Sequence, residues 1–168
     1  MSVALIFEGW QKTQAHLVHR LPQLGLRELQ LSASQDGWPI WAIVSHIAGA
    51  RVYWLCGVLK EGGADTTPFP DPLGSEGWED HLDVPRGQDE LVFAIESSWR
   101  IVESCLEHWT PEMLGETFTR ERAGQIQRHT RQSVLSRLVM HDAFHSGEVS
   151  LLLGTHGLAS MDPWEPIS

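Results

Sequence analysis

The sequence predicts an all-α protein: a four-helix bundle with a small β-hairpin before its last helix. Three observations predict this fold class. Apolar residues recur at helical spacing along four long segments. Segments rich in glycine and proline separate these four runs. A length of 168 residues, 42% of them hydrophobic, suits one domain spanning residues 1–168 with a core of its own.

The first two helices are bounded by prolines. The first is expected to run from about Ser2 into the region 21–26, where Pro22 must kink or end it. Its inward stripe comprises Ile6, Trp10, Leu17, Leu21 and Leu24. The second helix should begin with Pro39 in its first turn, where a missing N–H costs nothing, and end near Gly62–Gly63.

Residues 62–87 form a long irregular segment with four prolines and several glycines. Loops of this length in compact domains are usually functional or mobile. Two interpretations stay open at this point. The segment either covers a site as a lid, or it is a surface crossover between the second and third helices.

The third helix has the clearest periodicity. Its seven-residue repeat comprises Leu91, Ile95, Ser98, Val102, Cys105 and Trp109. A turn centred on Gly124 within residues 116–129 indicates a small β-hairpin. Thr130 is a good N-cap for the fourth helix, which should end at Gly154 or Gly157.

Two histidines lie on the apolar stripe of the fourth helix, in the run His141-Asp-Ala-Phe-His145. Residues four apart share one helix face, so both imidazoles should point inward. Burying two polar rings costs free energy unless each finds a partner, and one metal ion satisfies both. The alternative is a pair of core histidines bonded to backbone carbonyls or to Asp142 and Glu148.

A third histidine, His46, lies on a mostly apolar helical run. The same face carries Gly49, Ala50, Tyr53 and Gly57, and small residues one turn after a histidine leave room for a facing helix or a ligand. Three neutral imidazoles with an open position are the arrangement of catalytic zinc sites. Zinc or nickel would suit the set best, and iron or manganese also bind imidazole.

The motifs W-P-I-W-x4-H-I-A-G-A-R-x-Y-W at 38–54 and H-D-A-F-H-S-G-E at 141–148 resemble those of the DinB-like superfamily of metalloenzymes. The resemblance covers nearly the whole chain. It implies an up-down-down-up four-helix bundle, often dimeric, with one divalent metal held by His46, His141 and His145. Gly147-Glu148 departs from the Gly-Gln that often follows the last histidine. The family name does not imply DNA chemistry.

The resemblance also implies a reaction class. Related members include transferases that use low-molecular-weight thiols and some hydrolases, so a metal-dependent thiol transferase acting on a small molecule is expected first. The alternatives are a metal-dependent hydrolase and a non-catalytic metal- or ligand-binding bundle. Glu148, one turn after His145, and Tyr53, on the face of His46, are the candidate catalytic residues. Asp142 is a weaker candidate because it projects about 100° away from His141.

The net charge of −10 gives no general attraction to nucleic acid or to an anionic membrane. The nearest basic cluster comprises Arg120, Arg122, Arg128, Arg131 and Arg137. It is interpreted either as a solvated face or as an anion-reading rim beside the metal. The sequence contains no run of about 18 apolar residues and no signal peptide, and its two cysteines read as reduced core residues. A cytoplasmic protein is expected.

Eight tryptophans are many for 168 residues. Most should fill the core. Trp41, Tyr53, Trp54 and the chain end near Trp164 are candidate pocket walls, and Arg51 reads as an exposed helix charge or a carboxylate-binding residue. The surplus of apolar surface, together with the resemblance, predicts a homodimer.

Overall fold

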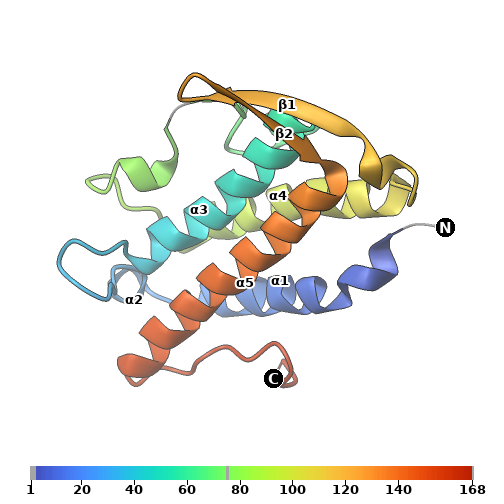
Figure 1. Cartoon of the computed structure of the whole chain (residues 1–168). Coiled ribbons are helices and arrows are strands. Elements are labelled where there is room, and N and C mark those ends of the chain that lie inside the picture. Colours follow the sequence, from blue (N-terminus) through green and yellow to red (C-terminus); the bar gives the residue numbers. More distant parts are fainter. Residues whose placement is uncertain (1–2, 75, 168) are drawn as a thin grey trace.

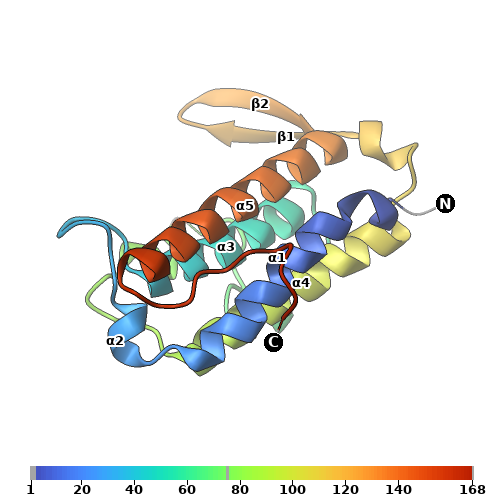
Figure 2. The ribbon, with the colours of Figure 1, turned by 90° about the horizontal axis from the view of Figure 1, so that it is seen from below.

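Four long helices pack side by side in the computed structural model, which describes residues 3–74 and 76–167 apart from the side chains of residues 5 and 6 (Figure 1). The helices are α1 (Glu8–Arg20), α3 (Ile40–Val52), α4 (Gln88–His108) and α5 (Arg131–Thr155). Helices α3 and α4 run in one direction, whereas α1 and α5 run in the other (Figures 1 and 2). The up-down-down-up bundle is therefore confirmed.

Proline ends α1 as predicted. Pro22 lies in a single 3₁₀ turn, Leu21–Gln23, directly after the helix, and another 3₁₀ turn, Ala4–Phe7, precedes it. The expected starting point at Ser2 and the side chain of Ile6 lie outside the described residues. A short helix, α2 (Leu26–Leu29), follows. It was not predicted, because one helical turn shows no periodicity.

Helix α3 begins one residue later than predicted. Pro39 is its extended N-cap residue, with φ −71° and ψ 160°, and does not lie in the first turn. After Val52 the helix widens into a π-helical turn, Tyr53–Val58. The helical run then ends close to the predicted boundary, with Lys60 in the left-handed region at φ 64°. π-Helical turns occur often at functional sites.

The predicted hairpin is present and leads directly into α5. Strand β1 (Thr117–Arg122) pairs antiparallel with β2 (Gln125–Thr130). The two turn residues, Ala123 and Gly124, both have positive φ, as a type I′ turn requires. Thr130 caps α5, because its hydroxyl accepts a hydrogen bond from the Ser133 amide at 3.1 Å.

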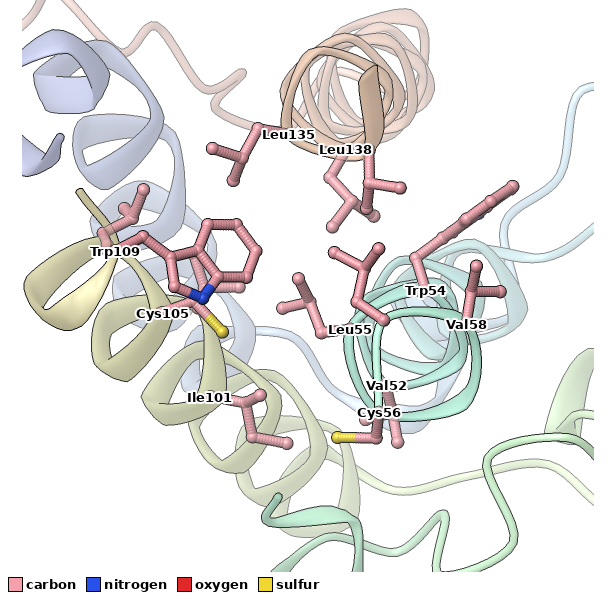
Figure 3. Close-up of a cluster of buried hydrophobic side chains, with 14 of the residues drawn as sticks. Val52, Trp54, Leu55, Cys56, Val58, Ile101, Cys105, Trp109, Leu135 and Leu138 are labelled. Carbon is pink, nitrogen blue, oxygen red and sulfur yellow. The ribbon is translucent and has the colours of Figure 1, made fainter. Parts of the chain in front are cut away.

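The core consists of two apolar clusters, one toward each end of the bundle. The cluster in Figure 3 joins the helical run around Trp54 and Leu55 to Cys105 and Trp109 of α4 and to Leu138 of α5. Every residue of the predicted seven-residue repeat in α4 is buried. This helix therefore follows its sequence pattern closely.

Both cysteines are buried and free. Burial is the main cause that raises the pKa of Cys56 to about 11, and burial also raises the pKa of Cys105. A thiol with a raised pKa is a poor nucleophile at neutral pH, which agrees with two structural core residues. None of the helices in the described part of the chain is long and apolar enough to cross a bilayer.

A fully buried ion pair crosses the bundle. Arg51 of α3 donates from Nε to Asp142 of α5 at 2.7 Å, and neither side chain is exposed to solvent. Trp10 of α1 donates to the same carboxylate oxygen at 2.6 Å, and Arg51 also donates to Gln14 of α1 at 2.8 Å. The expectation of an exposed Arg51 is wrong. The arginine binds a carboxylate of its own chain and, through a further bond from Nη1 to the Ile95 carbonyl of α4 at 3.3 Å, connects all four long helices.

We predict that replacing either charge alone lowers the free energy of unfolding by about 3–5 kcal/mol, because the remaining charge is buried without a partner. Arg51→Met and Asp142→Leu each test this in denaturant titrations, and the double variant should recover much of the loss. Lys12→Ala removes an exposed pair with Glu8 and serves as the control, with an expected change below about 1 kcal/mol. Additive losses in the double variant would contradict a coupled buried pair.

Candidate metal centre

Three histidines from two helices meet between α3 and α5. His46 comes from α3, and His141 and His145 come from successive turns of α5. One ring nitrogen from each lies within 4.8 Å of those of the other two, and the Nε2 atoms of His46 and His141 are 3.0 Å apart. All three side chains are partly buried. The helical spacing therefore brings together the three residues singled out by the sequence.

Two of the three imidazoles contact a carboxylate through Nδ1. The distance is 2.7 Å for His46 to Glu79 and 2.9 Å for His145 to Glu148. His141 Nδ1 lies 3.6 Å from Asp142 and has no hydrogen-bond partner among the described residues. A carboxylate at Nδ1 keeps the proton there and leaves the Nε2 lone pair free. Where the Nε2 lone pairs of His46 and His141 face each other at 3.0 Å, they repel unless a cation or a proton lies between them.

Glu79 is a functional residue that the sequence analysis missed. It belongs to the single 3₁₀ turn Trp78–Asp80 within the long crossover between α3 and α4. Trp78 holds this turn in place by packing on Phe69, with ring centroids 5.2 Å apart, and under the Arg86 guanidinium at 4.4 Å. The crossover therefore reaches the site and supplies a partner for His46. No helical periodicity marks such a residue in the sequence.

Asp142 lies behind the cluster. Its Oδ2 atom accepts the hydrogen bonds from Trp10 and Arg51, while Oδ1 lies 3.6 Å from His141 Nδ1 and has no hydrogen-bond partner among the described residues. The expectation that Asp142 projects away from the ligand position agrees with this geometry. Asp142 belongs to the buried ion pair and lies next to the ring of His141.

The site favours neutral imidazole. Burial lowers the pKa of His145, and the neighbouring rings of His141 and His46 lower it further, whereas the hydrogen bond to Glu148 acts in the opposite direction. A lower pKa keeps His145 unprotonated to more acidic pH than an exposed histidine. Unprotonated imidazole is the form that binds metal ions.

Aromatic side chains border the histidine cluster, but they differ from the pocket walls predicted from the sequence. Trp38 stacks near His46, with ring centroids 4.9 Å apart, and Phe144 lies 5.1 Å from the His145 ring. Trp41 is completely buried in the core. Trp164 stands over α1, where the Lys12 ammonium lies 4.9 Å from its ring, along the chain end that Figure 2 shows crossing α1. The predicted walls at Trp41 and Trp164 are therefore wrong.

Tyr53 is held by the hairpin. Its hydroxyl accepts a hydrogen bond from Arg120 Nη1 at 2.6 Å, two helical turns along from His46. Glu148 is hydrogen-bonded to His145. Of the two candidate catalytic residues, the structure brings Glu148 to the cluster. It places Tyr53 two helical turns beyond His46, in the π-helical turn that follows α3.

The donor set fits a divalent transition metal. Across the residues that the structure describes, no fourth histidine, cysteine or carboxylate joins the three nitrogens in a group that could hold a metal. A structural zinc site normally closes with a fourth side chain, whereas three protein ligands leave a position for water or substrate. The geometry is that of an open three-histidine site.

The family to which the chain belongs follows from its similarity to known proteins. The family model of the DinB superfamily matches residues 9–149, a span that includes all three histidines. A search of curated proteins found no match. Among solved structures, a DinB-like protein from Bacillus cereus ATCC 10987 superposes with a TM-score of 0.67, covering 96% of this chain and 97% of that chain at 17% identity. This likeness shows a shared fold, and the match to the family model shows that the chain belongs to the DinB superfamily.

Proposed function

We propose that the protein binds one divalent transition metal, zinc or nickel by preference, through His46, His141 and His145. The observation that carries this proposal is the convergence of three ring nitrogens within 4.8 Å, with a carboxylate hydrogen-bonded at the Nδ1 atoms of His46 and His145. Outer carboxylates of this kind orient metal-binding imidazoles and make them more basic. Iron and manganese suit the same donors, so the metal is proposed as a class.

We further propose that the site performs metal-dependent chemistry on a small molecule, with transfer of a low-molecular-weight thiol as the first candidate. A metal held there would lower the pKa of a bound thiol or water and so supply a nucleophile at neutral pH. Glu79 and Glu148 would hold the imidazole rings in place. Trp38 and Phe144 would border the reacting group with apolar surface.

Thiol transfer is placed before hydrolysis because a thiol loses its proton more readily than water does. Glu79 and Glu148 each contact an imidazole Nδ1 atom through one carboxylate oxygen. Glu148 is therefore proposed as a positioning residue. The open position argues against a purely structural metal.

The proposed reaction class is tested by loading the protein with Zn²⁺, Ni²⁺ or Mn²⁺ and measuring consumption of an electrophile with several low-molecular-weight thiols. Wild type should turn over at least one pair, and His145→Ala should lose most of that rate because it removes a ligand. Equal rates in both proteins with every metal and thiol would remove the transferase proposal. Consumption of ester or amide substrates without thiol would favour the hydrolase.

For metal content, elemental analysis of protein purified without a nickel column should find about one transition metal per chain. The triple variant His46→Ala/His141→Ala/His145→Ala should contain almost none. A matched triple variant, His19→Ala/His108→Ala/His156→Ala, removes exposed histidines elsewhere on the surface and should retain the metal. Equal metal in both triple variants would refute the site.

The Nδ1 carboxylates should set metal affinity. Glu79→Gln and Glu148→Gln are each expected to weaken binding by about 10- to 100-fold, because the imidazole loses its charged hydrogen-bond partner. The control is Glu76→Gln, which changes an exposed carboxylate of the same crossover that pairs with His81. Competition titrations with a chromophoric chelator measure the three affinities. A loss of the same size in the control would indicate a general charge effect.

We also propose a homodimer that forms through α5. Met140, Phe144 and Leu151 are 72%, 69% and 67% exposed and lie on one stripe of the helix. Exposed apolar stripes of this kind favour association. Sedimentation at micromolar concentration should show a dimer that Met140→Asp/Leu151→Asp converts to a monomer. Leu26→Asp, on the exposed side of α2, is the control and should leave the dimer intact. A wild-type monomer at every concentration would contradict this proposal.

A further inference from the structure

A second cluster of polar side chains surrounds Trp54, where the hairpin packs against α5 and the π-helical turn. The guanidinium carbon of Arg120, from β1, lies 4.3 Å from the Trp54 ring centre, and that of Arg137, from α5, lies 4.7 Å from it. The ring of His129, from β2, packs edge-on to the same indole at 4.9 Å. Three elements therefore bring basic side chains to one aromatic platform.

The two arginines of this cluster have no acidic partner. Within the described residues, no carboxylate lies within 4.0 Å of either guanidinium, whereas Arg51, Arg86 and Arg131 each pair with an acid. This contrast occurs in a chain with 22 acidic residues and only 12 lysines and arginines. Among the described residues, Arg20, Arg27, Arg100, Arg122 and Arg128 also have no carboxylate within 4.0 Å. What distinguishes Arg120 and Arg137 is that both guanidinium groups lie over one indole ring.

Neutral groups hold Arg120 in position. Its Nε donates to Gln127 at 2.9 Å and its Nη1 to the Tyr53 hydroxyl at 2.6 Å. Its Nη2 and the whole guanidinium of the exposed Arg137 donate no hydrogen bond to any described residue. Positive charge is concentrated here. Burial, together with the charges of Arg120 and Arg137, lowers the pKa of His129. Donors held in this way match an oxyanion, which guanidinium groups bind with paired hydrogen bonds.

The cluster lies on the same two helical runs as the three histidines. Arg137 comes one helical turn before His141 on α5, and Trp54 comes two turns after His46, so the two sites are separated by about 6–12 Å along the helices. Gly49 and Ala50 lie between them on α3 and are partly exposed, with Phe69 in van der Waals range of Gly49. A separation of this size is within the length of one small molecule.

We propose that Arg120 and Arg137, stacked on Trp54, bind the carboxylate or phosphate group of the substrate. The substrate would then be a small anionic molecule whose charged group lies one to two helical turns from its reacting atom. This substrate class rests on the proposed function of the three-histidine site. The anion site itself does not, and it can be tested alone.

The test uses two probes, inorganic phosphate and acetate, titrated separately into the full-length protein. Binding is followed by calorimetry and by the imidazole C–H resonance that disappears in His129→Gln. Arg120→Gln/Arg137→Gln should weaken the better probe at least tenfold, since both charged hydrogen-bond donors are lost. Arg122→Gln/Arg128→Gln makes the same charge change on the same hairpin and is the matched control, expected to alter binding less than threefold.

A single variant guards against loss of folding. Arg137 is exposed and donates no hydrogen bond within the described part of the chain, so Arg137→Gln should keep the wild-type melting temperature and still weaken the probe severalfold. Equal weakening in the matched control, or no saturable shift of the His129 resonance with either probe, would overturn the anion site. A stacking role alone would give that result.

His145→Ala separates this inference from the proposed metal. If the variant loses its metal but keeps anion binding at the Trp54 cluster, both sites are supported. If anion binding disappears with the metal, the anion binds at the histidines and the Trp54 site is refuted. If wild type binds no metal yet binds phosphate or acetate at Trp54, the anion site stands and the proposed function fails.

Discussion

The buried pair of Arg51 and Asp142 is the interaction on which the relative position of α3 and α5, and so of their histidines, depends. It joins α3 to α5 at 2.7 Å, and Trp10 and Gln14 bring α1 into the same network. Buried charges tolerate little displacement, because their desolvation is offset only at short distance. Asp142 is the residue after His141, so the register that the ion pair sets between α3 and α5 also sets where His141 meets His46. The buried polar network and the histidine cluster therefore depend on the same register between α3 and α5.

The helical part of this protein could be predicted from its sequence because the relevant signals are local. The repeat from Leu91 to Trp109, the cap at Thr130 and the turn at Gly124 all lie where the pattern places them. The same periodicity placed His141 and His145 on an inward face. Periodicity alone did not show which helix faces these histidines. The apolar helical run around His46 indicated it.

The remaining features depend on distant parts of the chain. Glu79 is 33 residues from His46 and lies on a crossover without periodicity, so nothing in its neighbourhood marks it. Arg51 looks like a surface charge until Asp142 is known to lie opposite. Trp164 lies over α1 because of the path of the chain end, which no helical pattern describes. The three histidines of the candidate site could therefore be predicted from the sequence. Most of the residues around them could not, because their positions depend on tertiary contacts.

The hydrogen bond from His46 to Glu79 joins a rigid element to an irregular one. His46 is held by a helix whose neighbouring residues are fully buried, whereas Glu79 is carried by a single 3₁₀ turn wedged between Phe69 and Arg86. Any excursion of the crossover removes the acceptor from Nδ1, and the proton is then free to move to Nε2. Loop position and imidazole tautomer are thus coupled, because the position of the crossover decides whether Nδ1 has an acceptor for its proton.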